Sequence, residues 1–423
     1  MSAATETRRP RTAADRLGLP VLRGHGLFIT GNLIDSVGNG MLLPLGLLYF
    51  TDVQGLPLAQ VGAAMTAGQA LALPVTFLAG RLMDRFGPKR VVVWANILSA
   101  AGFALFLLAG RPWHIAGAYV LVQAGINMYF TAQRTLITHV TRAGERRSWF
   151  AFTGSLRNIG LAAGSAAAAG ALTVFGNGSL RWMIAADAAT YLLAAACFAA
   201  LATEPPEPDG ASPTALVTRT DDTRRYLLLV AVNIPYVLAQ AVLAVLVAVY
   251  TTRALGLPAS AASTLFVVNT VIVSACSTAV TAHLAPKVPR RAVAAGYLVM
   301  TAGMGVFAVP ALPALPALPG AASAAWAALI VAITLFSVAE ILLGPALSEL
   351  SVSLTPQAAG GFTQGLYQFS WAVGMVAAPA LFTGLLEAGP LLPWGVEAAA
   401  CLVGALAAPA LRAPNRHRRR NPR

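Results

Sequence analysis

Twelve long apolar segments constrain this chain more than any other feature of its sequence. Each has about the 20 residues that a helix needs to cross the hydrocarbon core of a bilayer, and a helix satisfies its own backbone hydrogen bonds in lipid. Charged residues make up only 11% of the chain, against about 25% in soluble domains. We therefore expect an all-α integral membrane protein. The segments run at about 27–50, 58–80, 90–110, 114–138, 149–173, 181–202, 226–251, 258–284, 291–311, 321–350, 360–386 and 390–411.

Basic residues are distributed unequally over the loops between these segments. If the N-terminus is cytoplasmic, 25 of the 29 lysine and arginine residues lie in cytoplasmic loops and tails. Only Arg111, Arg181 and Arg253 lie in the opposite loops, and Arg157 lies within a span. Positive charge marks the cytoplasmic side, so we expect a multi-pass protein of the plasma membrane with both termini in the cytoplasm. The net charge of +13 is spread over loops and tails, which argues against a nucleic-acid partner.

A polar stretch at 203–225, rich in proline and acidic residues, interrupts the apolar pattern and reads as a flexible cytoplasmic linker. It divides the chain into two six-helix bundles, at 26–202 and 226–411. Basic cytoplasmic tails at 1–25 and 412–423 flank them. The repetitive segment Pro310–Pro319 is expected to be a stiff connector on the external side.

The stretch Gly80–Arg90 has the ordered pattern G-x-L-x-D-R-x-G-x-K-R. Gly80 allows two helices to approach closely, and Gly87 supplies the backbone angles of a tight turn. Asp84 can cap a helix N-terminus or pair with an arginine. The remaining charges hold the loop on the cytoplasmic side; they are Arg85, Lys89 and Arg90.

This pattern resembles the signature loop between helices 2 and 3 of the major facilitator superfamily of transporters. The resemblance implies twelve helices in two six-helix pseudo-repeats, and a monomer. A shift of 201 residues lays Thr281–Arg291 on the motif with Ala285 in place of Asp84, as a degraded second copy. The resemblance also implies that Asp84 meets the N-terminus of the helix near 360–364, or Arg134, and latches the cytoplasmic side.

Five charged residues are candidates for a place within the bilayer, where a charge is costly and is expected to have a function or a partner. Asp35, Arg157 and Glu340 are about 12–15 Å from the cytoplasmic ends of their helices, at a rise of about 1.5 Å per residue. The superfamily resemblance implies that these three face one central aqueous space, where a carboxylate can exchange protons with either side. The alternative is a static buried pair or a group that packs helices. Asp187 lies near the outer end of a peripheral helix, and we expect it to have a structural role. Glu397 lies near the outer end of the last span, and we expect it at the membrane–water interface.

Polar side chains recur at helical spacing on four of the spans. With their aromatic neighbours they predict a large, adaptable and mostly apolar cavity for a lipophilic or amphipathic organic molecule. The alternative is hydrogen bonding between helices. The stripes comprise Asn32, Asp35 and Asn39; Gln123, Asn127, Phe130 and Arg134; Asn233, Tyr236 and Gln240; and Gln364, Gln368 and Trp371.

The first functional hypothesis is a secondary transporter that exports a small organic compound against entering protons. The region around Glu340 and Pro345 resembles the helix-10 region of bacterial multidrug-exporter-like members. The fifth span carries glycines but lacks the Gly-Pro pair of drug–proton antiporters, which keeps an uptake symporter or uniporter open. A non-transporting membrane protein on the same fold is the third hypothesis. No nucleophile–base pair, metal-ligand spacing or phosphate loop is present, so we expect no enzyme activity, cofactor or metal.

Overall fold

The computed structural model describes seven stretches of the chain, at 17–42, 49–142, 144–202, 220–257, 260–312, 321–355 and 360–411. These described residues form helices and no strand. The tail residues 1–16 and 412–423, linker residues 203–219 and connector residues 313–320 lie outside the described residues, so the expectations for them stay predictions.

The first half of the chain forms the six spans of one bundle. Over the described residues of the whole chain, eight helices are long and apolar enough to cross a bilayer, or nine if the bent pair α4–α5 is one span. Helices α4 and α5 together make the second span, and residues 43–48, between α2 and η1, lie outside the described residues. The elements are α2 (Gly26–Leu42), η1 (Tyr49–Val53), α4 (Leu58–Leu71), α5 (Val75–Phe86), α6 (Pro88–Phe106), α7 (Pro112–Val140), α8 (Arg146–Phe175), η2 (Gly176–Gly178) and α9 (Ser179–Ala199).

The second half forms the six spans of a second bundle, which completes a twelve-helix fold. Its first two spans each continue into π-helical turns. The elements are α10 (Thr220–Ala241), η3 (Val242–Leu246), α11 (Val247–Val249), η4 (Tyr250–Ala254), α12 (Ser260–Ala279), η5 (Val280–Leu284), α13 (Pro289–Ala308), η6 (Val309–Ala311), α14 (Ala321–Ser353), α15 (Gly360–Ala388), α16 (Leu392–Ala407) and η9 (Ala408–Ala410).

Two boundaries differ from the sequence prediction. The second span bends by 40° between α4 and α5, beside Pro74, and continues to Phe86 instead of ending near residue 80. The signature motif is therefore mostly helical, and Gly87, at φ 82°, is the single residue between α5 and α6. In addition, α10 begins at Thr220, so the linker ends six residues earlier than the predicted 225.

Each bundle has its own apolar core. In the second half the Trp394 ring stacks on Phe307 at 4.8 Å and meets the edge of Tyr250 at 4.7 Å. In the first half one core cluster surrounds Phe103 and another surrounds Trp149. Separate cores allow the two bundles to move as units against each other.

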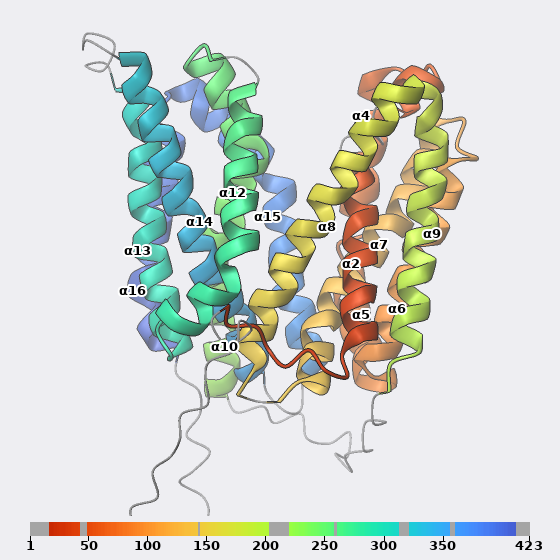
Figure 1. The fold of residues 1–423 in the computed structure, drawn as a ribbon, viewed down its shortest axis with the longest axis horizontal. Coiled ribbons are helices and arrows are strands. Elements are labelled where there is room, and N and C mark those ends of the chain that lie inside the picture. The colour runs from red at the N-terminus through yellow and green to blue at the C-terminus, as the bar shows by residue number, and fades with distance from the viewer. Residues whose placement is uncertain are drawn as a thin grey trace, which may run out of the picture.

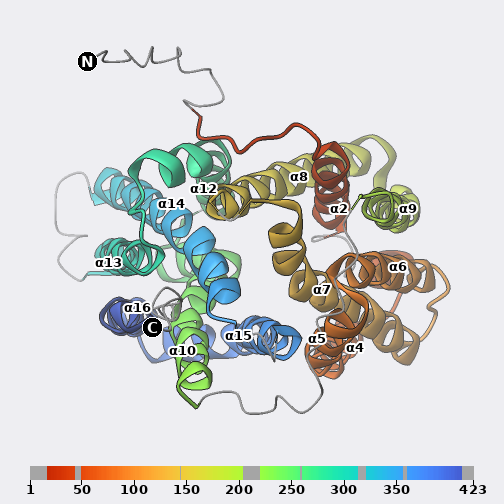
Figure 2. The same cartoon turned by 90° about the horizontal axis from the view of Figure 1, so that it is seen from below.

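The two bundles touch at one end of the molecule and diverge toward the other (Figure 1). We call the touching end, which carries Gly87, the motif end, and the other, which carries Gly176, the opposite end. Contacts between bundles join α5 and α7 to α15, and α8 to α12 and α14. In the view along the helices these pairs lie side by side around the centre (Figure 2). The chain is therefore closed at the motif end.

Helices α2 and α8 pack closely through glycine. A Cβ atom added at Gly164 would lie 2.0 Å from the backbone oxygen of Val37, and one at Gly40 would lie 2.2 Å from that of Leu161. Backbones that approach this closely gain van der Waals contact that larger residues prevent. The contact holds the helix that carries Asp35 against the helix that carries Arg157.

Gly164→Val is expected to lower the melting temperature of the purified protein by a few degrees, because overpacking costs about 1–3 kcal/mol. Gly170→Val is the matched control, since a Cβ at Gly170, on the same helix, meets nothing within 4 Å. Thermal unfolding in detergent followed by tryptophan fluorescence measures both. Equal melting temperatures for the two variants would contradict the packing of α2 on α8.

Candidate functional site

The motif end is closed by a hydrogen bond between the two bundles. The backbone N–H of Gly361, in the first turn of α15, donates to Oδ1 of Asp84 at 2.7 Å. The first turn of a helix has free N–H groups that favour an anionic acceptor. This is the first of the two contacts that the resemblance implied for Asp84, and Arg134 has other partners.

Glycine makes this hydrogen bond possible. A Cβ atom at Gly361 would lie 1.9 Å from the backbone oxygen of Gly80, and one at Gly365 would lie 2.6 Å from that of Thr76. The phenyl ring of Phe77 stacks on Phe362 at 5.6 Å beside them. Helices α5 and α15 therefore touch backbone to backbone, with rings covering one side of the contact.

Arg134 makes the second polar contact between the bundles. Its Nη2 donates to Oε1 of Gln368 at 2.9 Å and its Nε donates to Oε1 of Gln364 at 3.4 Å. The guanidinium also lies 4.6 Å from the ring centroid of Tyr367, an arrangement that attracts a cation to an aromatic face. Next to it, Gln368 lies within 3.5 Å of Asn127. The half-buried charge of Arg134 is thus held by neutral groups of α15.

The basic residues of the motif make contacts within the first bundle or none that the structure describes. Lys89 donates to the backbone oxygen of Leu201, just beyond the end of α9. Arg85 lies 5.2 Å from the ring centroid of Phe86, and Arg90 is exposed. These residues therefore position the motif, while Asp84 alone of its charged residues reaches the other bundle.

The degraded copy of the motif also contacts the opposite bundle, but with different chemistry. Ala285 stands where the first copy has its aspartate, and Arg147 in the first turn of α8 donates to the backbone oxygen of Pro286. Glu349 of α14 interacts electrostatically with Arg147. A carbonyl oxygen and a glutamate thus replace the missing carboxylate.

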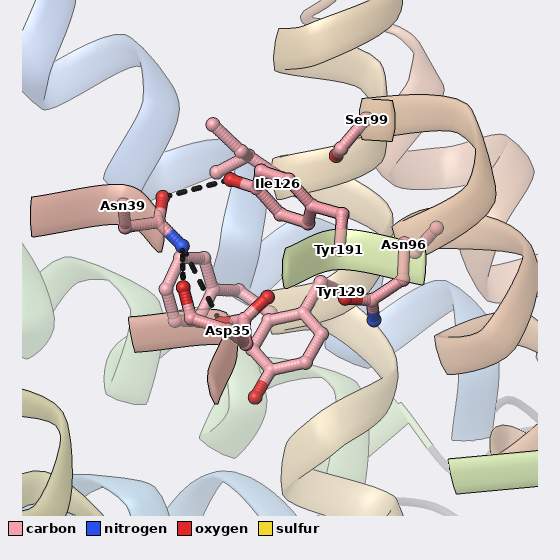
Figure 3. Close-up of a pocket in the computed structure, with 9 residues that line it drawn as sticks. Asp35, Asn39, Asn96, Ser99, Ile126, Tyr129 and Tyr191 are labelled. Atoms are coloured by element: carbon pink, nitrogen blue, oxygen red, sulfur yellow. Dashed lines mark hydrogen bonds between the residues drawn. The ribbon is translucent and has the colours of Figure 1, made fainter. Parts of the chain in front are cut away.

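A polar cluster lies inside the first bundle at the level of Asp35, which is 5% exposed. Asn39 donates to the backbone oxygen of Asp35 at 2.8 Å and to its Oδ2 at 3.4 Å, and the Tyr191 hydroxyl donates to Asn39 at 3.0 Å (Figure 3). These groups adjoin a small pocket with room for about one water molecule. Its lining consists of Asp35, Asn39, Ala95, Asn96, Ser99, Ile126, Tyr129, Phe130 and Tyr191.

Asn32 packs helices rather than facing a ligand. Its Oδ1 accepts from the Tyr129 hydroxyl at 2.8 Å and from Gln133, and its Nδ2 donates to the backbone oxygen of Phe28 at 2.7 Å. The amide therefore has partners on both sides within the α2–α7 interface. For this residue the structure favours the alternative of hydrogen bonding between helices.

Asp187 lies closer to the site than the sequence suggested. It is 0% exposed, and a Cβ at Gly38 of α2 would lie 2.4 Å from its Oδ1. The Thr190 hydroxyl is 3.4 Å from the same oxygen, and Asp35 interacts with Asp187 electrostatically. In the sequence, the spacing of Asp187, Thr190 and Tyr191 places them on one face of a helix. This spacing could have indicated a polar contact, but the expected peripheral position of the helix favoured a structural role.

Glu340 is the polar centre of the second bundle. Asn269 donates from Nδ2 to Oε2 of Glu340 at 3.0 Å and lies 3.0 Å from the Ser337 hydroxyl. Gln240 lies beside the same carboxylate. Its Nε2 has no hydrogen-bond partner among the described residues. The spacing patterns gave no weight to Asn269, because it is the single amide side chain of its span and forms no stripe with other amides.

The stripes on α10 and α15 face each other. The Tyr367 hydroxyl donates to Asn233 at 2.8 Å, and Tyr236 meets the Trp371 ring edge to face at 5.6 Å. The Trp371 indole N–H finds no hydrogen-bond partner within the described part of the chain. On α7, Gln123 is partly exposed. Aromatic surface therefore lines this region.

Arg157 lies between the two acidic centres. Its guanidinium is 4.5 Å from the ring centroid of Phe130, and it interacts electrostatically with both Asp35 and Glu340. The side chain is exposed although it sits about 12 Å into its span, so it faces the space between the bundles. The structure thus brings one arginine from α8 together with carboxylates of α2 and α14.

Glu397 does not belong to this constellation, and its position at the membrane–water interface stays a prediction. It is 1% exposed, and the thiol of Cys401 lies 3.5 Å from its Oε1. Both residues lie on α16, one turn apart, inside the second bundle. Burial and a weak donor on the same helix indicate a structural group.

Three comparisons with known proteins agree with this architecture. Residues 28–311 match the family model of the Major Facilitator Superfamily. The Multidrug resistance protein MdtH of Yersinia enterocolitica and that of Yersinia pestis are each 29% identical over 127 residues, which is 30% of this chain. The match spans only 32% of the length of these relatives.

Solved structures match over nearly the whole chain. A variant of the E. coli Fucose:proton symporter FucP has a TM-score of 0.73 at 15% identity and covers 92% of this chain and 98% of its own. A bacterial homologue of the iron transporter ferroportin, in an outward-facing state, has a TM-score of 0.70 at 15% identity and covers 92% and 99%. At this identity the likeness shows the fold. The chain belongs to the Major Facilitator Superfamily.

Proposed function

We propose that the chain exports a lipophilic or amphipathic small organic molecule, in exchange for protons, by alternating access. The observation that carries the proposal is that Arg157, exposed between two bundles that are closed at the motif end, interacts electrostatically with both Asp35 and Glu340. The likeness to multidrug resistance proteins over part of the chain supports the substrate class.

Charge balance favours an exchange of cations. One arginine can neutralise one of the two carboxylates, and the other then needs a proton or a cationic ligand, because an unpaired charge inside a membrane protein is costly. A cationic substrate and a proton therefore compete for Asp35 or Glu340. Competition at one site that opens alternately to each side is sufficient for antiport.

The lining of the central region suits an adaptable pocket. Phe130, Tyr236 and Trp371 supply aromatic surface, which binds flat apolar and cationic molecules. A sugar or a phosphate would need a denser set of polar or basic groups.

The motif end is assigned to the cytoplasm by its charge. Arg81, Arg85, Lys89 and Arg90 lie at this end, and positive residues favour the cytoplasmic side. On this assignment the protein is a monomer of the plasma membrane with cytoplasmic tails and a cytoplasmic linker between two bundles, at 26–202 and 226–411. The conformation described above is then the outward-facing one, and the Asp84–Gly361 hydrogen bond is the latch that stabilises it.

Transport in inverted vesicles tests the function. With an imposed pH gradient, the wild type is expected to accumulate members of a panel of lipophilic cations and neutral drugs. Asp35→Asn and Glu340→Gln are expected to lose about 90% or more of the gradient-driven accumulation, because each removes a carboxylate that exchanges protons. Glu397→Gln, which removes a buried carboxylate outside the site, is the control and keeps the activity.

The same assay separates the other candidates. Accumulation that ignores the gradient and both carboxylate variants would favour a uniporter, and gradient-driven movement in the reverse direction would favour an uptake symporter. No movement of any compound, with the protein folded in the membrane, would favour a non-transporting role.

Asp84→Ala is expected to shift the protein away from the conformation closed at the motif end. A hydrogen bond to a charged acceptor contributes about 1.5–3 kcal/mol, so the ratio of closed to open protein falls about tenfold or more. Spin labels at His139 and Arg291, which are exposed in the two bundles at this end, report the distance by pulsed electron resonance. The labels are placed in a background without native cysteines.

Arg81→Ala is the matched control for the latch. Arg81 is exposed one turn before Asp84 on α5. Its removal changes the charge of the motif end without touching the hydrogen bond to α15. A distance distribution that Asp84→Ala leaves unchanged, or that Arg81→Ala changes as much, would refute the latch.

A further inference from the structure

A short segment before α2 connects the two bundles at the motif end. Residues 17–25 run from the start of α2 along the outside of α8 to the end of α12 (Figure 2). The same red trace crosses the motif end from α2 toward α12 in the side view (Figure 1). We call residues 17–25 the strap. The export cycle proposed above assigns it no role.

A glycine places the strap directly against the second bundle. Gly18 has a φ of 64°, a left-handed conformation that favours glycine. A Cβ atom at Gly18 would lie 2.5 Å from the Cβ of Ala282 and 2.6 Å from the backbone oxygen of Thr278. The backbone of the strap therefore contacts the end of α12 and the start of η5, and no side chain fits between them.

A histidine fixes the other end of the strap to the first bundle. The Nε2 of His25 donates to the backbone oxygen of Val140 at 2.7 Å, and its ring lies 4.7 Å from that of Trp149. Val140 is the last residue of α7, where carbonyl groups have no partner within the helix. Trp149 lies near the start of α8. The histidine therefore holds the strap against the ends of two helices of the first bundle.

The strap lies where the seam between α8 and α12 lacks the glycine contact of the other seam. Between α5 and α15, Gly361 lies against the backbone oxygen of Gly80. The shift of 201 residues that aligns the two motif copies places Thr281 at the position of Gly80, and Thr281 lies between the two residues that contact Gly18. A Cβ added at any glycine of α8 would contact α2 or nothing within 4 Å, so these glycines do not approach α12. The strap thus supplies the glycine contact that the opposite bundle supplies in the first copy.

We propose that the strap is a second latch of the conformation closed at the motif end, with Gly18 on the second bundle and His25 on the first. The seven residues from Gly18 to His25 reach at most about 25 Å, so α12 can move only a limited distance from α2 while Gly18 stays in contact. Opening of the motif end then requires the strap to leave α12. The latch rests on the alternating access proposed above, but not on the substrate, the proton coupling or the direction of transport.

Two glycine variants separate this contact from the conformation of the backbone. Gly18→Asn introduces a residue that tolerates the left-handed conformation but adds a Cβ where Ala282 and Thr278 leave no room. Gly24→Asn makes the same change on the same strap, at φ 83°, where a Cβ meets nothing within 4 Å. We expect Gly18→Asn to lower the ratio of closed to open protein about threefold or more, because only the closed state contains the overlap. Gly24→Asn is expected to leave this ratio unchanged.

Two pairs of spin labels report the outcome by pulsed electron resonance. The full-length protein is studied in lipid nanodiscs, without native cysteines and without substrate. Labels at Leu17 and Leu284, which are both exposed, measure whether the strap contacts the second bundle. Labels at His139 and Arg291 measure whether the motif end is open. We expect a narrow distribution for the first pair in the wild type, which Gly18→Asn broadens while it adds a longer distance for the second pair.

Variants of His25 test the other end of the strap and leave Gly18 unchanged. His25→Leu removes the donor to Val140 and is expected to broaden the distribution between Leu17 and Leu284 and to raise the open fraction. His25→Gln keeps an N–H donor and is expected to restore most of the closed fraction. This pair keeps the proposal testable if Gly18→Asn fails to fold.

The opposite results would overturn the latch. A broad distribution between Leu17 and Leu284 in the wild type would mean that the strap does not hold the second bundle. An open fraction that neither Gly18→Asn nor His25→Leu changes would mean that the strap lies on closed bundles without holding them. An equal effect of Gly24→Asn would assign the change to backbone strain instead of the contact.

The result is independent of the vesicle assay, because no transported compound is present. Drug export that fails in vesicles while the strap variants open the motif end would refute only the proposed export. Export that proceeds while these variants leave the closed fraction unchanged would refute only the latch.

Discussion

The backbone contact between α5 and α15 is the interaction on which the described conformation depends. Gly80 and Gly361 approach so closely that a side chain on either would overlap the other backbone, and Asp84 then reaches a free N–H at the start of α15. Both parts are needed. The glycines allow α5 and α15 to approach closely but do not fix their relative position, and the hydrogen bond fixes it. A contact of one carboxylate with one helix end can also be broken at modest cost, which a protein with two alternating states requires.

The closure at the second pair of helices uses different chemistry, and the difference has a physical consequence. On the α5–α15 side a carboxylate accepts from a helix N-terminus. On the α8 side, Arg147 donates to a loop carbonyl near Ala285 and interacts with Glu349. Two unlike contacts depend differently on salt, since Coulomb attraction between side chains is screened more than a short backbone hydrogen bond. The two sides of the closed end therefore need not open together.

The sequence was sufficient for the fold, while the roles of the charged residues inside the spans stay predictions. Apolar length and the asymmetry of basic residues predict helices and their order without any knowledge of packing. The motif predicted the partner of Asp84 through its resemblance to a family. The sequence did not predict the exact boundaries of individual helices. The second span bends beside Pro74 and continues to Phe86, and its second part, α5, packs against α15 of the other bundle.

Side-chain partners between helices were beyond sequence reasoning for a related reason. Helical spacing tells which residues share a face, but not which face another helix covers. Asn32 and Asn39 share a stripe with Asp35, yet Asn32 is saturated by Tyr129 and Gln133 whereas Asn39 touches the acid. The sequence favoured a structural role for Asp187 because its helix is peripheral. In the structure Gly38 of the neighbouring helix α2 leaves room for its carboxylate beside Asp35 and Asn39.

The two carboxylates differ in how far the protein encloses them. Asp35 is enclosed by the helices of its own bundle and lines a pocket with room for about one water molecule. Glu340 is more exposed and is flanked by Asn269 and Gln240 beside aromatic surface. Arg157 faces both from the space between. Since a single arginine cannot satisfy both acids, occupation of one carboxylate changes the free energy of binding at the other, and that coupling is what an exchanger requires.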